Sequence, residues 1–220
     1  MPKIIVLMGA PGAGKGTQAR LLQERKSLPQ ISTGDIFRAL AKADTPLAAE
    51  VRAVQAAGQL ISDELVIRVV DERTSADDCR DGYILDGFPR TTVQAAMLEE
   101  IARRQGHELL AIFVDAPFEL LEKRTAGRRT CPVCGEIYNV YFRPPKQEGF
   151  CDFHPEVALQ HRVDDMPEKI KVRLATYEEQ TKPLLDYYAG GGRLYRVDAT
   201  RDPELVYADI ERILTKEGDE

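Results

Sequence analysis

The chain has 220 residues, of which 43% are hydrophobic and 30% charged, and its formal net charge is −6. This composition is typical of a globular protein with one large core, and the acidic balance argues against a nucleic-acid partner unless basic residues gather on one face. No apolar run approaches the ~20 residues that span a bilayer, and the N-terminal apolar segment is too short for a signal peptide, so we expect a cytoplasmic protein that binds no membrane.

Short apolar runs alternate along the chain with longer amphipathic segments. The runs are mostly aliphatic and are typical of buried parallel strands; they cover residues 4–8, 83–85, 109–114 and 194–197, with a fifth short strand expected at 29–32. Helical patterns cover residues 15–25, 62–73, 91–104, 117–125 and 167–188. Because each strand needs a helix before the next, we predict an α/β fold with a doubly wound, parallel, five-stranded sheet.

Two regions interrupt this alternation. Residues 32–61 contain only short helical patterns, whereas residues 130–160 combine Cys, Pro and Gly with aromatic residues. We expect a small helical insertion in the first region and a small, irregular β insertion in the second.

The segment GAPGAGKGT follows the first predicted strand directly and precedes a predicted helix. Gly9, Gly14 and Lys15 have the spacing G-x-x-x-x-G-K, which is typical of a phosphate-binding loop in this context. Backbone N–H groups can surround a phosphate there, the helix directs its positive end at it, and Lys15 adds a cation. The alternative, a plain glycine-rich turn, is disfavoured because the motif lies between a strand and a helix, as a phosphate-binding loop requires.

The residue after Lys15 departs from the usual pattern. A Ser or Thr is expected there to contact magnesium, but this chain has Gly16, with Thr17 next. Magnesium would then be held mostly through water and substrate oxygens, because it dehydrates reluctantly. This argues against a switch-type GTPase.

The β insertion contains a second chemical motif. Two pairs with two intervening residues are separated by sixteen residues, which is the spacing of a zinc ribbon; the predicted ligands are Cys131, Cys134, Cys151 and His154. Four protein ligands leave no open position, so the zinc would be structural. Disulfides are the competing interpretation, His161 is a possible substitute for His154, and Cys79 is expected to be a small buried hydrophobic residue.

The motifs GAPGAGKGTQA, ISTGDIFR, AGQLISDELV, LDGFPRT, TAGRR and HRVDD occur in the order and spacing of adenylate kinases, so nearly the whole chain resembles this family. The resemblance implies a P-loop kinase core at 1–31, 62–128 and 161–220, a mobile AMP-binding segment at 32–61 and a zinc-binding lid at 129–160. It also implies the reaction ATP + AMP ⇌ 2 ADP with Mg²⁺. We expect a monomer, because no spare amphipathic seam is visible.

The same resemblance implies a catalytic set of cations with one carboxylate, since phosphoryl transfer depends on positioned charge rather than on a base. Its members are Lys15, Asp86, Arg90, Arg128, Arg162 and Arg173. Asp86 would lie near the hydrated magnesium, or could simply cap a turn. Asp164 and Asp165 match a pair that latches the lid by binding its arginines, and either could instead cap the helix that begins near residue 167.

Two nucleotide subsites follow from the resemblance. The ATP site would comprise Gly12, Ala13, Gly14, Lys15, Gly16, Thr17, Arg124, Arg128, Ile137, Tyr138 and Arg201. The AMP site would comprise Thr33, Arg38, Gln59, Leu60, Ile61, Gly87, Phe88, Pro89, Arg90, Gln94, Arg162 and Arg173. Arg124 could stack on adenine or be a surface charge, and many relatives have Lys where this chain has Gln59, so only a backbone role is transferred there.

Two other functions compete with this one. A kinase of the same fold could use GTP as the donor or another nucleoside monophosphate as the acceptor. The choice of donor depends largely on backbone contacts, here near Thr200 and Arg201, and this chain has Ala199 where relatives usually have Gly. A non-catalytic zinc-ribbon binding module would not need Lys15 and the arginines.

Overall fold

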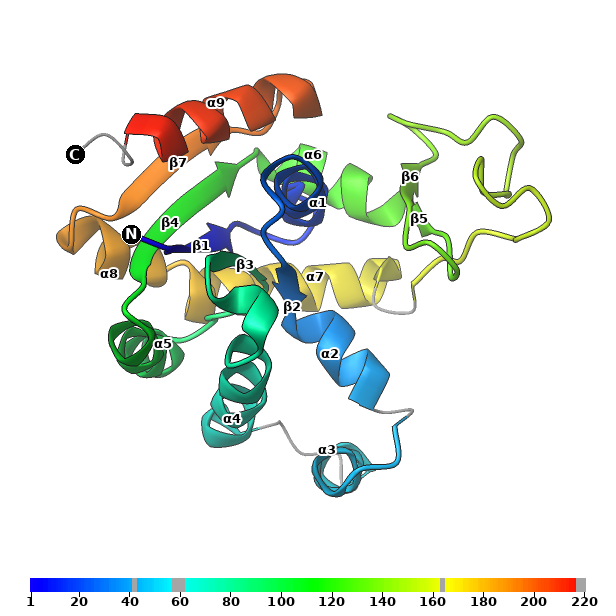
Figure 1. The fold of residues 1–220 in the computed structure, drawn as a ribbon. Helices are drawn as coiled ribbons and strands as arrows, with labels where there is room; N and C mark the ends of the chain where they lie inside the picture. Colours follow the sequence, from blue (N-terminus) through cyan, green and yellow to red (C-terminus); the bar gives the residue numbers. More distant parts are fainter. Residues whose placement is uncertain (41–42, 57–61, 163–164, 217–220) are drawn as a thin grey trace.

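The computed structural model describes residues 1–40, 43–56, 62–162 and 165–216. Its centre is a five-stranded sheet in which every described pairing is parallel, in the order β2-β3-β1-β4-β7 (Figure 1). The strands are β1 (Lys3–Met8), β2 (Gln30–Ser32), β3 (Gly82–Asp86), β4 (Glu108–Asp115) and β7 (Leu194–Asp198). All five strands expected from the sequence, including the short one at 29–32, are therefore confirmed.

The central strand β1 is buried on both faces, which explains its continuous apolar sequence. Successive side chains of a strand point to opposite faces, so Ile5 packs in one hydrophobic cluster while Ile4 and Val6 pack in another. In the sheet register, Ile5 lies opposite Ile84 of β3 and Leu110 of β4. Such a strand needs helices on both sides.

Helices cover each face of the sheet, as a doubly wound fold requires. One cluster includes residues of α1 (Lys15–Lys26), α6 (Phe118–Ala126), α7 (Pro167–Thr176) and α9 (Pro203–Lys216). The other includes residues of α4 (Asp63–Thr74), α5 (Thr92–Gln105) and α8 (Leu184–Gly190). Among the described residues, no helix has the length and apolar character needed to cross a membrane.

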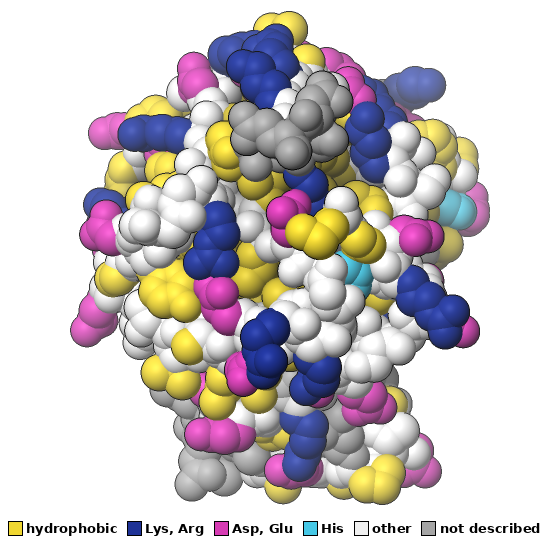
Figure 2. Space-filling view, turned by 60° about the vertical axis from the view of Figure 1, so that its left-hand side comes forward, with side chains coloured by type: hydrophobic (Ala, Val, Ile, Leu, Met, Phe, Trp, Pro, Cys, Tyr) yellow, Lys and Arg dark blue, Asp and Glu magenta, His cyan; other side chains and the backbone are white. Residues whose placement is uncertain are grey.

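The two predicted insertions are present. Helices α2 (Thr33–Leu40) and α3 (Pro46–Ala56) follow β2 and extend below the core in Figure 1. Strands β5 (Arg128–Thr130) and β6 (Ile137–Asn139) form an antiparallel pair that supports the irregular segment at the right of the figure. On the face shown in Figure 2, Lys and Arg side chains lie among Asp and Glu side chains.

The segment predicted as helical over 167–188 is helical, but it is not one regular α-helix. Helix α7 ends at Thr176, a wider π-helical turn covers Tyr177–Thr181, and α8 begins at Leu184. Pro183 has no backbone N–H and its ring crowds the preceding turn, so a regular helix cannot pass through it. The wider turn is closed by the Lys182 amide, which donates to the Tyr177 carbonyl at 2.9 Å.

Helix α9 lies outside the elements that the periodicity predicted. Its buried residues Val206, Tyr207 and Ile210 have helical spacing and pack in the same cluster as α1. Pro203 opens the helix and Asp202 precedes it, with its Oδ1 accepting from the Glu204 amide at 2.9 Å. These start signals were available in the sequence.

Candidate active site

The glycine-rich loop joins the carboxyl end of β1 to α1, at the edge where α/β sheets bind ligands. Gly14 has φ 105° and caps α1, so the helix begins at Lys15 with its amide groups directed at the loop. Gly12 has φ 86°, and a Cβ there would lie 2.5 Å from the Leu121 carbonyl oxygen. The loop therefore needs glycine both for its backbone conformation and for its close approach to α6.

Lys15 turns back over this loop. Its Nζ donates to the carbonyl oxygens of Gly9, at 2.8 Å, and Ala10, at 3.0 Å. Burial lowers the pKa of this ammonium to about 8, Asp86 opposes that shift, and three arginines add to it: Arg90, Arg128 and Arg173. The fold thus brings five of the six predicted catalytic residues into one electrostatic neighbourhood.

Asp86 ends β3 beside the loop. Burial raises the pKa of its carboxyl, while Lys15 lowers it. A Cβ at Gly16 would come within 3.5 Å of its Oδ2, so the absent side chain leaves room beside a carboxylate. A hard cation that keeps its water shell, such as magnesium, fits this combination of an oxygen ligand and open space.

Asp165 connects two of the arginines. Its side chain is 0% exposed, and it accepts from Arg128 Nε at 2.7 Å, from Arg128 Nη2 at 2.6 Å and from Arg173 Nη1 at 2.9 Å. A buried carboxylate needs such partners to remain charged. Of the two aspartates expected to bind arginines, Asp165 does so, whereas Asp164 lies outside the described residues.

Several predicted residues are only partly described. Arg162 is half-buried, and its backbone carbonyl accepts from the Asp165 amide at 3.0 Å. Its backbone therefore lies beside the Asp165 that binds Arg128 and Arg173. The side chain of Arg38 and residues 59–61, which are Gln59, Leu60 and Ile61, lie outside the description. Their predicted contacts with the acceptor nucleotide are therefore not tested by the structure.

On the predicted donor side, Arg124 is half-buried and its Nη1 donates to the Ala199 carbonyl at 2.7 Å. Burial lowers the pKa of this guanidinium. Ile137 from the lid lies over the loop, since its Cδ1 would be 3.7 Å from a Cβ at Gly16. The Tyr138 side chain is buried within residues 129–160, and Arg201 pairs with Asp209 at 2.7 Å, so the structure does not test their predicted contacts with the donor nucleotide.

On the predicted acceptor side, a compact hydrogen-bonded turn follows β3. Thr33 Oγ1 donates to the Gly87 carbonyl at 3.1 Å, and Arg90 Nε donates to the same oxygen at 2.8 Å. Phe88 and Pro89 are buried between them. Gln94, on the first turn of α5, lies against this turn and is 6% exposed.

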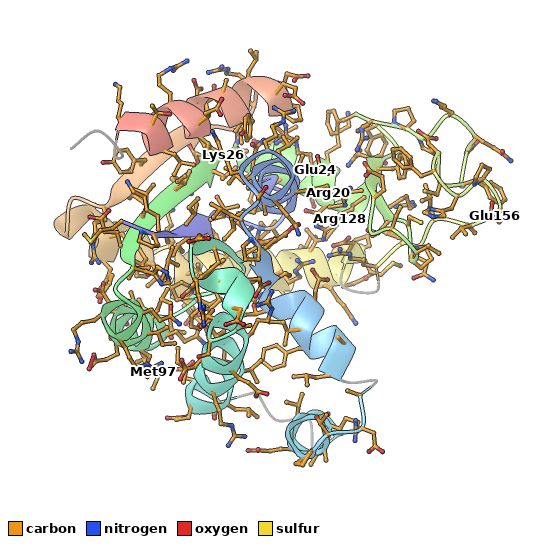
Figure 3. The ribbon with its side chains drawn as sticks, in the orientation of Figure 1. Arg20, Glu24, Lys26, Met97, Arg128 and Glu156 are labelled. Carbon is orange, nitrogen blue, oxygen red and sulfur yellow. The ribbon has the colours of Figure 1, made fainter. Side chains whose placement is uncertain are left out.

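A contact between the lid and the core was not predicted. Arg20 of α1 forms an ion pair with Glu136 of the lid and also donates to the Gly135 carbonyl. Figure 3 shows Arg20 on the side of α1 that faces β5 and β6, with Arg128 labelled next to it. No motif identified either residue, because an arginine on an amphipathic helix usually indicates a solvated face.

The predicted metal ligands come together in the lid. Their ligand atoms all lie within 4.8 Å of one another; the residues are Cys131, Cys134, Cys151 and His154. The Sγ atoms of Cys134 and Cys151 are 3.7 Å apart, and Cys151 Sγ is 3.7 Å from His154 Nδ1. Tetrahedral zinc with Zn–S bonds of about 2.3 Å holds its ligand atoms roughly 3.8 Å apart, so the cluster fits zinc. The alternative ligand His161 is exposed and outside this cluster.

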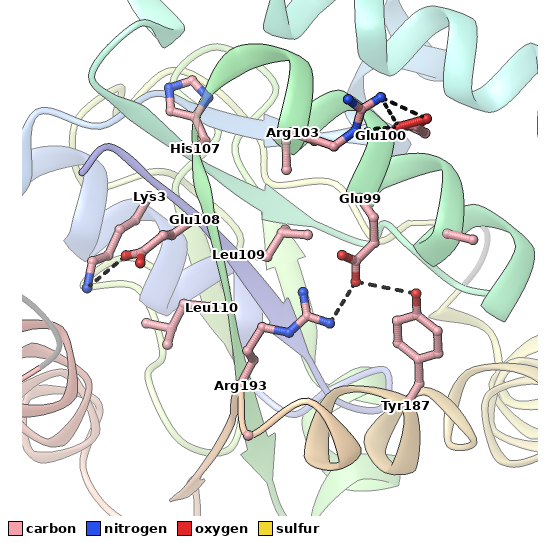
Figure 4. A pocket seen from close by; sticks show the side chains of 13 residues that line it. Lys3, Glu99, Glu100, Arg103, His107, Glu108, Leu109, Leu110, Tyr187 and Arg193 are labelled. Carbon is pink, nitrogen blue, oxygen red and sulfur yellow. Dashed lines mark hydrogen bonds and ion pairs between the residues drawn. The ribbon is translucent and has the colours of Figure 1, made fainter.

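A separate hollow of about 720 Å³ lies at the amino ends of β1 and β4 (Figure 4). Its charged side chains pair with one another: Lys3 with Glu108 at 3.9 Å, and Arg193 with Glu99 at 2.7 Å. Tyr187 also donates to Glu99, at 3.3 Å. Because α/β sheets bind ligands at the opposite edge, we assign no function to this hollow.

The sequence profile of one family, described as adenylate kinase, matches residues 7–192. The chain is 47% identical to an adenylate kinase of Oceanobacillus iheyensis over 213 residues, which cover 96% of this chain and 99% of the relative. It is also 46% identical to an adenylate kinase of Shouchella clausii, covering 96% and 98%, and 47% identical to one of Thermodesulfovibrio yellowstonii, covering 96% and 99%.

Proposed function

The chain belongs to the adenylate kinase family, and we propose that the charged cluster at the carboxyl edge of its sheet performs the family's reaction. The protein transfers the terminal phosphoryl group of ATP reversibly to AMP, which gives two molecules of ADP. One observation supports the cluster as the site: Asp86 lies beside Gly16 of the loop, and Asp165 joins Arg128 and Arg173 by ion pairs.

Positioning and charge account for the catalysis we propose. The amides of the loop and the positive end of α1 bind the phosphates of ATP, and Lys15 bridges them. During transfer the negative charge spreads over the equatorial oxygens, where guanidinium groups stabilise it without proton transfer. We assign this task to Arg90, Arg128, Arg162 and Arg173. Their release from Asp165 and from backbone carbonyls would accompany nucleotide binding.

Adenylate kinases use magnesium with ATP, and we propose that Asp86 holds this ion through its water shell. When bound there, magnesium would neutralise negative charge on the phosphates of ATP. The chain's own contribution is a carboxylate at the end of a rigid strand and the open space left by Gly16. Burial raises the pKa of that carboxyl, and the positive charge of Lys15 opposes this shift.

We further propose the division of labour that the family resemblance implies. Residues 32–61 would bind AMP, residues 129–160 would form the lid over ATP, and the remaining chain would form the core. The lid would carry one structural zinc on its Cys3His cluster. Cytoplasmic residence and a monomeric state remain predictions, and light scattering at assay concentration tests the second.

ATP affinity of the free protein should depend on pH through Lys15. Its pKa is lowered to about 8, so the ammonium is charged well below this pH and loses its proton as the pH rises through it. Bound phosphates favour the charged form, so the Kd for ATP should rise by roughly tenfold per pH unit above that pKa. Calorimetric titrations across this range measure the effect. A Kd for ATP that stays constant would contradict the predicted role of this ammonium.

Replacing Gln94 or Arg90 by alanine should raise the KM for AMP by about tenfold or more, or lower kcat, because both are assigned to AMP. Binary titration should show nearly unchanged affinity for ATP. Val93→Ala is a matched control for Gln94, because Val93 is exposed on the same helical turn. Equal loss of ATP and AMP affinity would show that the two subsites are wrongly assigned.

A further inference from the structure

The carboxamide of Gln94 is held at both ends by other groups of the protein. Its Oε1 accepts from the backbone amide of Arg90 at 2.8 Å, and its Nε2 donates to Asp63 Oδ1 at 2.7 Å. Gln94 stands three residues after Thr91, which caps α5 and accepts from the Gln94 amide at 3.1 Å. This resembles a capping box in which the side chain reaches back to the residue before the cap.

These two partners leave only one orientation of the carboxamide. A backbone N–H can only donate, so it must face the oxygen of Gln94, and an ionised carboxylate can only accept, so it must face the nitrogen. A flipped amide would place a donor against the Arg90 amide and an acceptor against Asp63. Each mismatch costs a hydrogen bond and leaves a poorly exposed polar atom without a partner.

A carboxamide has two donor hydrogens and two acceptor lone pairs, so one of each remains for a ligand. Adenine offers a complementary pair, because its N1 accepts and its 6-amino group donates. Hypoxanthine and guanine have the opposite pair, with a donor at N1 and an acceptor at O6. A freely rotating glutamine could match either pattern by flipping, whereas a fixed glutamine matches only one.

We infer that Asp63 is a positioning residue that selects adenine in the acceptor site by preventing the flip of Gln94. This inference rests on the proposed role of Gln94 in binding the AMP base. Asp63 is the first residue of α4, directly after the cap Ser62, and it is half-buried beside α5. Asp63 thus lies on α4 and Gln94 on α5, so two rigid helices fix the distance between the two side chains.

Asp63 also has an ordinary structural role that the test must separate. An acidic residue in the first turn of a helix stabilises it through the helix dipole. Glu64 occupies the same turn, is exposed and has no hydrogen bond to Gln94 among the described contacts. Glu64→Ala therefore removes the same kind of charge without releasing the carboxamide, and serves as the matched control.

The experiment compares AMP with inosine monophosphate as acceptors, with ATP as donor, in the wild type and in Asp63→Ala, Asp63→Asn, Glu64→Ala and Gln94→Ala. Inosine monophosphate is the cleaner probe because it reverses the hydrogen-bond pattern without the extra 2-amino group of guanine. The readout is the ratio of kcat/KM for AMP to that for inosine monophosphate. Asp63→Ala should lower this ratio by on the order of tenfold.

The other variants decide the interpretation. Asp63→Asn should keep most of the selectivity, because its Oδ1 can still accept from Gln94, and Glu64→Ala should leave the ratio unchanged. Combining Asp63→Ala with Gln94→Ala should give the same ratio as Gln94→Ala alone. If Gln94→Ala lowers the ratio but Asp63→Ala does not, the inference is wrong while the proposed function stands. If Gln94→Ala leaves the ratio unchanged, the assignment of Gln94 to the base fails, and the inference fails with it.

Discussion

Lys15→Ala should lower kcat by a factor on the order of 10² or more, because this ammonium stabilises charge that grows on the transferred phosphoryl group. Its Nζ donates to the carbonyls of Gly9 and Ala10, at 2.8 and 3.0 Å, which hold it over the loop. These contacts place the ammonium at the loop that is proposed to bind the phosphates. Steady-state kinetics with ATP and AMP measure the loss.

Lys26→Ala is the matched control for this variant. Lys26 lies at the other end of α1, where it pairs with Glu211 at 2.5 Å, so its removal takes the same charge from the same helix. We expect nearly unchanged kcat for Lys26→Ala, and thermal unfolding should show that Lys15→Ala remains folded. A Lys15→Ala protein with near-full activity would overturn the assignment of the loop.

Of the changes considered for this protein, removal of the zinc proposed for the lid should lower the thermal stability most. The lid has a very small core of its own, in which Cys131, Tyr138 and Cys151 are the fully buried members. So small a core cannot offset the cost of ordering the segment, so the zinc proposed for it would supply folding energy. Chelation or Cys131→Ser should lower the melting temperature by about 10 °C or more, and should affect activity less at moderate temperature.

Elemental analysis of freshly prepared, reduced protein should give about one zinc per chain. Cobalt, which also accepts tetrahedral geometry, should restore the melting temperature after chelation. Cys79→Ser is the matched control, because Cys79 is buried in the core and outside the cluster, so this variant should keep its zinc. Absence of bound metal in the reduced wild-type protein would contradict the zinc assignment.

The sequence predicted the parts of the molecule whose chemistry is local. The loop from Gly9 to Lys15 needs glycine backbones next to a strand and a helix, and the ligands Cys131 to His154 have a spacing that few other structures require. The buried strands were visible because both faces of a central parallel strand are apolar. These signals depend on neighbours in the chain.

Contacts between distant segments could not be predicted in the same way. The pair of Arg20 with Glu136 joins residues 116 positions apart, and that of Asp63 with Gln94 joins residues 31 apart. From the sequence alone, each of these side chains would be interpreted as a surface charge or as part of a helix cap. The break in the helix at Pro183 was visible, but helical periodicity on both sides of it outweighed a single residue.

The most direct test of the assigned reaction is a coupled assay that combines each common nucleoside triphosphate with each nucleoside monophosphate and measures diphosphate formation. ATP with AMP should give the highest kcat/KM, and Lys15→Ala should reduce that activity by the factor given above. A higher kcat/KM with GTP as donor, or with a monophosphate other than AMP as acceptor, would contradict it.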